Sequence, residues 1–207
     1  MKENKQPIFK SIFGSSWNKL PIVMQKHYAN RPYSNDVVTV KGKMDIEFNW
    51  FGKLCAPLFR IFGTLIPYQG KNIETTVHYK SSKIDNSFSF DRILHFPNKK
   101  PFYLKSKIVP IKGKKVIEYM GFGFGLCMNY KYEDNLVKLT YLGYIIKVFD
   151  LNIPVPLSFL IGKGYAEERA ISNNSFKMFV TITHPLWGRV YKYRGQFNII
   201  KQVNRVN

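Results

Sequence analysis

Charged side chains interrupt several otherwise apolar faces of this sequence, and they are its main candidates for chemistry. Arg92 shares an alternating face with Phe88 and Phe90, and Glu118 shares one with Met120. An ionised group on a buried face is costly unless it is paired or solvated in a cavity. Such groups therefore form internal ion pairs or line a ligand pocket. The ligand-binding candidates are Arg92, Glu118, Glu167, Arg169, His184 and Trp187.

A pocket of this composition suits an apolar or amphipathic small molecule. An apolar wall with a few convergent polar groups is the usual form of a small-molecule site. Arg92, Arg169 and His184 would hold an acidic head group. The apolar tail would lie against a pocket wall formed by Phe88, Phe90, Met120 and Phe124.

An enzyme is the alternative interpretation of the same residues. Glu167 or His184 would then act as a general acid or base, but no nucleophile or oxyanion donor can be placed, so the catalytic residues are unknown. The Pro- and Gly-marked turn after His184 would either form a pocket mouth or let Trp187 plug one end of a barrel, with Arg189 over its ring.

The sequence lacks the familiar motifs for metals, nucleotides and hydrolysis. Its histidines lie on separate elements, and no Walker loop, GxSxG or HExxH is present. The run from Gly121 to Gly125 alternates with apolar residues, which predicts a side-chain-free stripe within one strand over 115–132 that allows sharp curvature or close approach of another element. Cys55 and Cys127 are expected to be reduced thiols in a cytoplasmic protein. No metal and no cofactor are predicted.

The candidate residues lie on segments that alternate with the period of a β-strand. Residues 38–50 keep apolar and polar side chains on opposite sides, and short turns separate the segments that follow. Helical spacing predicts a short helix from Ser16 and an almost wholly apolar helix over 53–66. The further strands are expected near 73–81, 86–96, 102–111, 115–132, 136–148, 164–171, 176–184 and 189–200.

Successive strands joined by such short turns pair antiparallel. The predicted fold class is therefore mostly β: a curved antiparallel meander of about nine or ten strands forming a barrel or half-barrel, lipocalin-like by analogy. A short N-terminal helix precedes the meander, and the apolar helix follows its first long strand. Residues 16–200 form one domain, with a loose lead-in over 1–15 and a tail over 201–207.

The net charge of +19 is the largest anomaly of composition. Such a charge attracts polyanions, although a Lys- and Asn-rich genome would also produce it. Nucleic-acid binding is disfavoured because the basic residues form no known reading motif. An anionic membrane surface is a second candidate partner, contacted peripherally by the basic surface and by the apolar helix around Phe51, Phe59, Phe62 and Ile66. No apolar run is long enough to cross a membrane.

Several stretches together resemble the bacterial domain-of-unknown-function family DUF4166. This resemblance covers roughly residues 16–199 and implies an NAD(P)-dependent oxidoreductase as a partner, since that domain often follows a saccharopine-dehydrogenase-like module. The chain itself has no dinucleotide-binding βαβ unit. The matching stretches are Leu20-Pro21, His27-Tyr28, Pro57 to Arg60, Pro67 to Gly70, Phe90 to Arg92, His95 to Pro97, Gly162 to Glu168 and Thr183 to Arg189.

Overall fold

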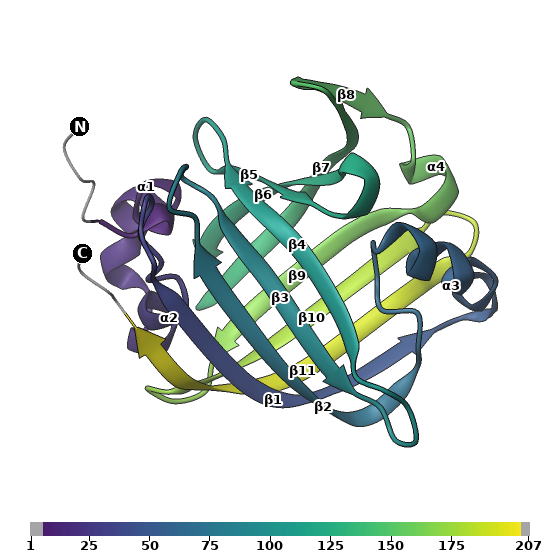
Figure 1. Cartoon of the computed structure of the whole chain (residues 1–207), viewed down its shortest axis with the longest axis horizontal. Helices are drawn as coiled ribbons and strands as arrows, with labels where there is room; N and C mark the ends of the chain where they lie inside the picture. Colours follow the sequence, from purple (N-terminus) through teal and green to yellow (C-terminus); the bar gives the residue numbers. More distant parts are fainter. Residues whose placement is uncertain (1–5, 204–207) are drawn as a thin grey trace.

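The strands form an antiparallel β-barrel in the computed structural model, which describes residues 6–203 (Figure 1). The strands are β1 Val37–Phe48, β2 Gly70–Ser81, β3 Phe88–His95, β4 Phe102–Pro110, β5 Lys115–Tyr119, β6 Phe124–Glu133, β7 Leu136–Val148, β8 Leu151–Val155, β9 Lys163–Ala170, β10 Ser175–His184 and β11 Gly188–Val203.

Ten of these strands form a closed ring, and β8 lies outside the ring, where it pairs with the end of β7. Each of β1 to β5 pairs with the next strand, β6 pairs with β7, and β7 pairs with β9. Strands β10 and β11 complete the circuit back to β1. The mostly-β antiparallel fold is thus confirmed, and the ring is a full barrel, not a half-barrel.

Short helical segments cover one end of the barrel, which we call the closed end (Figure 1). They are α1 Ile8–Phe13, η1 Gly14–Lys19 and α2 Ile22–His27. The expected short N-terminal helix is confirmed, but the segment from Ser16 is divided into η1 and α2, because Leu20 before Pro21 is extended, as proline requires. The expected loose lead-in over 1–15 is wrong for α1, whose Phe9 and Ile12 are buried in the core. Residues 1–5 and 204–207 lie outside the described chain.

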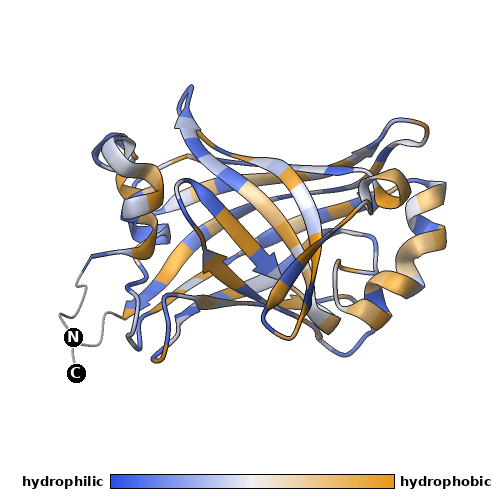
Figure 2. Cartoon of the chain, turned by 90° about the horizontal axis from the view of Figure 1, so that it is seen from above, coloured by the Kyte–Doolittle hydropathy of each residue, from blue (hydrophilic) through white to orange (hydrophobic). Residues whose placement is uncertain are grey.

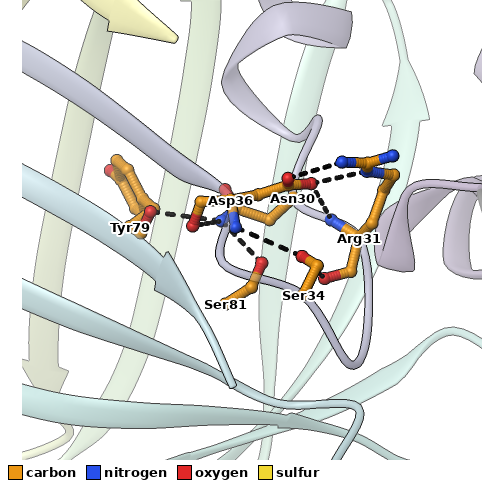
Figure 3. A network of polar contacts seen from close by, with 6 residues as sticks. All are labelled: Asn30, Arg31, Ser34, Asp36, Tyr79 and Ser81. Carbon is orange, nitrogen blue, oxygen red and sulfur yellow. Dashed lines mark hydrogen bonds and ion pairs between the residues drawn. The ribbon is translucent and has the colours of Figure 1, made fainter. Parts of the chain in front are cut away.

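A polar network holds the connection between α2 and β1 against the barrel (Figure 3). The Asn30 side-chain amide donates to the backbone oxygens of Asp36 and Tyr79 and to the Ser81 hydroxyl. Arg31 donates through Nε and Nη2 to the Asp36 carboxylate, at 2.8 Å for each bond. Because buried polar groups are costly without partners, this paired set fixes the N-terminal helices on the closed end.

The opposite end carries the helix α3 Trp50–Phe62. It begins earlier and ends earlier than the expected 53–66, because the Asn49 side chain caps the Gly52 amide and Gly63 adopts a left-handed conformation. A second short helix, α4 Ser158–Ile161, lies at the same end. Among residues 6–203, no helix is long and apolar enough to cross a membrane.

The glycine-rich run does not continue one strand, contrary to expectation. Strand β5 ends at Tyr119, and the tight turn η2 Gly121–Gly123 leads into β6. A Cβ on Gly121 would lie 2.2 Å from the Phe62 backbone oxygen, so only glycine allows this approach of α3. The predicted close approach of another element is real, but it occurs at a hairpin turn.

Candidate functional site: a cavity inside the barrel

The barrel encloses a cavity of about 280 Å³, close to the lower end of the roughly 300–1,000 Å³ typical of small-molecule sites. At the closed end its lining side chains are buried, among them Phe9 and His27. At the other end Leu58 of α3 and Leu160 of α4 line it and are 48% and 56% exposed. The cavity therefore opens between α3 and α4.

The first polar cluster in the cavity joins β3, β4 and β5. The Arg92 guanidinium donates through Nη2 to the Ser106 hydroxyl at 2.8 Å and to the Glu118 carboxylate at 3.0 Å. The Ser106 hydroxyl donates to the same carboxylate oxygen at 2.6 Å. The Arg92 Cζ atom also lies 4.0 Å from the centre of the Phe90 ring, a cation–π geometry. The charge of Arg92 is thus neutralised inside the barrel.

One donor of this cluster has no partner. The Nε atom of Arg92 is buried and makes no hydrogen bond within residues 6–203. An unmade hydrogen bond of a charged group is expensive. A ligand with an acceptor oxygen would satisfy this N–H.

The second polar cluster lies at the closed end, where α2 meets β9. The Tyr28 hydroxyl donates to Glu168 Oε2 at 2.5 Å, and His27 Nε2 lies 3.5 Å from the same oxygen. All of these side chains are buried, and His27 Nδ1 has no hydrogen-bond partner in the described chain. This cluster offers a ligand a second unsatisfied polar atom.

Buried phenols surround the two clusters. Burial raises the pKa of Tyr28, Tyr79 and Tyr130 well above the ordinary value, and the Glu168 carboxylate raises it further. Burial also raises the pKa of Tyr193, partly offset by the positive charge of Arg92. These phenols are therefore neutral at any physiological pH, so the tyrosines add neutral hydroxyls to the polar part of a mostly apolar wall.

The structure brings some of the predicted site residues together. Arg92 and Glu118 line the cavity and form the ion pair described above. The four predicted wall residues also line it, and they come from β3, from β6 and from the residue before η2: Phe88, Phe90, Met120 and Phe124. The sequence left internal ion pairs and a ligand pocket as alternatives. Arg92 and Glu118 do both, since they pair with each other and line the cavity.

Glu167 and Arg169 do not line the cavity, contrary to the sequence-based assignment. On β9 the inward side chains belong to Ala166 and Glu168, whereas Arg169 is exposed and Glu167 accepts a hydrogen bond from Tyr165. The assignment to the inner face relied on the apolar neighbours Tyr165 and Ile171. It is wrong because the inner face of β9 consists of small and acidic residues.

His184 and Trp187 also lie away from the cavity lining. The His184 Nδ1 atom accepts hydrogen bonds from the backbone N–H groups of Leu186 and Trp187. The proton of the neutral ring is therefore on Nε2, which donates to the Phe159 carbonyl oxygen at 2.8 Å. Trp187 stacks on Phe51 of α3, with ring centroids 5.4 Å apart. Both residues therefore join the β10–β11 turn to α3 and α4.

Sequence reasoning missed the second cluster. Glu168 follows Glu167 directly, and only the facing of β9 distinguishes them. Tyr28 and His27 precede the meander by many residues, so nothing in strand alternation connects them to a cavity. Their occurrence among the stretches shared with a known family is the only sequence signal that could have indicated them.

Among solved structures, the chain is similar to the dehydratase domain of the polyketide PpsC from Mycobacterium tuberculosis, with 4% identity, a TM-score of 0.23, and 93% of this chain and 84% of that chain covered. For the dehydratase domain from the CurJ module of curacin polyketide synthase, the identity is 12%, the TM-score 0.18, and the covered shares 80% and 76%.

No curated protein matches the chain. The family model described as "Domain of unknown function (DUF4166)" matches residues 20–197, which is most of the chain and agrees with the resemblance seen in the sequence. The chain belongs to the DUF4166 family.

Proposed function

We propose that this protein is a non-catalytic binding module for one amphipathic small molecule, held inside the barrel. The observation that carries the proposal is the cavity of about 280 Å³, apolar along most of its wall, in which Arg92 Nε is buried without a partner. Closed barrels of similar strand number hold one small ligand. Glu167 and His184, either of which would be the general acid or base in the enzyme alternative, do not line this cavity.

The two polar clusters of the cavity favour a neutral head group over the acidic one expected from the sequence. Glu118 already neutralises Arg92, and Glu168 is a second acidic side chain that lines the cavity. Burying another carboxylate there would leave it without a free counter-charge. A hydroxyl or carbonyl oxygen can accept from Arg92 Nε without that cost. An NAD(P)-dependent oxidoreductase partner stays a prediction.

Uptake of the neutral fluorophore N-phenyl-1-naphthylamine tests the proposal. We expect saturable, blue-shifted fluorescence with the wild-type protein. The variant Gly164→Leu should weaken uptake by at least about tenfold, because Gly164 lines the cavity and a Cβ placed there meets only Leu126, at 4.0 Å. The added side chain would fill the space that the fluorophore needs.

Gly143→Leu is the matched control. Gly143 also lies on a strand and has open space where a Cβ would lie, but it does not line the cavity. This variant should bind the fluorophore as the wild type does. Absence of uptake by the wild type, or equal uptake by all three proteins, would refute the proposal.

Competition between two ligands of equal chain length tests the head group. Decanol should displace the bound fluorophore at a concentration at least about tenfold lower than decanoate does, because the carboxylate must be buried beside Glu168. Stronger displacement by decanoate would restore the acidic head group and contradict the role given to the Arg92–Glu118 pair.

A further inference from the structure

The end of the barrel that carries α3 and α4 exposes large apolar side chains on several separate segments. Phe149, at the turn between β7 and β8, is 91% exposed, and Phe159 of α4 is 84% exposed. Soluble proteins rarely leave so many apolar side chains together in water unless the patch binds something. We call this surface the rim and define it by Leu54, Ile61, Phe122, Phe149, Phe159 and Leu186.

Four of the rim segments contact one another around the cavity mouth: α3, η2, α4 and the β10–β11 turn. The fifth, the β7–β8 turn, projects next to them, since a Cβ on Gly123 of η2 would lie 2.7 Å from the Lys147 carbonyl oxygen at the end of β7. At the end of α3, Phe62 packs against Phe122, with ring centroids 5.8 Å apart. At its beginning, Trp50 packs against Trp187 of the β10–β11 turn at 5.3 Å. The His184 ring joins that turn to α4. Figures 1 and 2 show α3 at the end opposite the N-terminal helices, so the rim and the closed end are opposite ends of the molecule.

The charged residues of the rim segments are almost all basic. Over 50–63, 120–124, 147–163 and 184–189 the sequence has a single acidic residue, Asp150. The basic residues of these segments are exposed and alternate with the apolar ones: Lys53, Arg60, Lys147, Lys163 and Arg189.

We propose that the rim docks on an anionic lipid membrane. Apolar side chains on separate turns can insert into the interface independently, and neighbouring basic residues contact anionic head groups. A second copy of this chain fits less well, because a symmetric contact through the rim would place like charges opposite each other. The occupant that complements both the apolar and the basic side chains is the lipid surface.

The face of α3 that docks differs from the one expected from the sequence. Phe59 and Ile66 are only 5% and 2% exposed, because they pack into the core. The exposed face of the helix instead carries Leu54 and Ile61, each next to a basic residue. Membrane contact through Phe59 and Ile66 is therefore excluded by their burial.

Docking would place the cavity mouth against the lipid. The mouth lies between Leu58 and Leu160, within the rim. An amphipathic ligand could then pass between bilayer and cavity without crossing water. Docking rests on the rim alone, whereas this route of transfer also rests on the proposed function.

Flotation with vesicles of about three parts phosphatidylcholine to one part phosphatidylglycerol tests the docking. The wild-type protein should float with them, and with pure phosphatidylcholine vesicles its partition should fall by about tenfold. The double variant Phe149→Ser/Phe159→Ser should lower the partition by at least about tenfold, because two inserted rings are lost. Folding is little affected, since both side chains are exposed.

Ile84→Ser is the control for a generic loss of surface apolarity, because Ile84 is 86% exposed at the closed end. It should float within about twofold of the wild type. Failure of the wild type to float, or equal losses in the control and the double variant, would overturn the proposal. Self-association that the double variant abolishes, in a protein that does not float, would assign the rim to a second copy instead.

The same assay separates docking from ligand binding. Gly164→Leu should float as the wild type does, since its added side chain points into the cavity and not to the rim. Flotation without fluorophore uptake would leave docking supported and refute the binding module. Fluorophore uptake without flotation would support the binding module and refute docking.

Discussion

The two ends of the barrel use aromatic side chains in opposite ways. At the closed end, Phe9 is 2% exposed and lies 4.5 Å from Tyr28 between ring centroids, with Phe88 and Tyr130 as further neighbours. At the rim, Phe159 extends into solvent. Buried rings contribute to folding through area removed from water, whereas exposed rings contribute little.

This difference indicates a division of roles. The closed end seals the barrel and holds the buried polar cluster of Tyr28, Glu168 and His27. The rim surrounds the mouth and leaves apolar area available for contact with another surface. Substitutions at the two ends should therefore separate stability from binding, which the following predictions test in order of expected size.

The largest difference should come from truncating one phenylalanine at each end. Phe9→Ala should lower the free energy of unfolding by about 3–5 kcal/mol, because it removes a buried ring and leaves a void. Phe159→Ala should change it by less than about 0.5 kcal/mol. Urea unfolding measures both changes. Similar losses of unfolding free energy at the two ends would contradict the division of roles.

A smaller difference is expected between two hydrogen-bonded carboxylates. Glu168→Leu should cost about 1–3 kcal/mol, since it leaves Tyr28 and His27 buried without their acceptor. Glu47→Leu removes a carboxylate that is 43% exposed and pairs with Lys192, a type of surface pair worth about 0–1 kcal/mol. If the second loss equals the first, burial is not the cause.

Alkaline pH should destabilise the closed end through its tyrosines. Their pKa is raised in the folded state, so the unfolded chain loses these protons first as the pH rises above about 10. Stability is therefore fully present below that pH and falls above it. Each such tyrosine contributes about 1.4 kcal/mol per pH unit.

Tyr130→Phe checks this directly, because phenylalanine cannot ionise. Unfolding followed between pH 10 and 11.5 (about the range in which free tyrosine titrates) should show a slope shallower by about that amount. An unchanged slope would mean that Tyr130 ionises equally in both states and is not shielded at the closed end.

Strand positions were largely predictable because they depend on local alternation. The expected strands near 102–111, 136–148 and 176–184 differ from β4, β7 and β10 by at most one residue at each end. The inward orientation of Arg92 on β3 and Glu118 on β5 could be read from the sequence for the same reason, because large apolar neighbours mark the inner face of each strand. Alternation fails where the inner face is not apolar, as on β9, where Ala166 and Glu168 face inward.

By itself, the sequence determined the antiparallel meander and placed Arg92 of β3 and Glu118 of β5 on the same strand faces as their apolar neighbours. Only the tertiary structure decided that β6 pairs with β7 to close the barrel, that α2 brings Tyr28 to Glu168, and which face of α3 is exposed. Local patterns depend on neighbours along the chain. Ring closure and contacts such as Tyr28 with Glu168, 140 positions apart, depend on how all strands curve together.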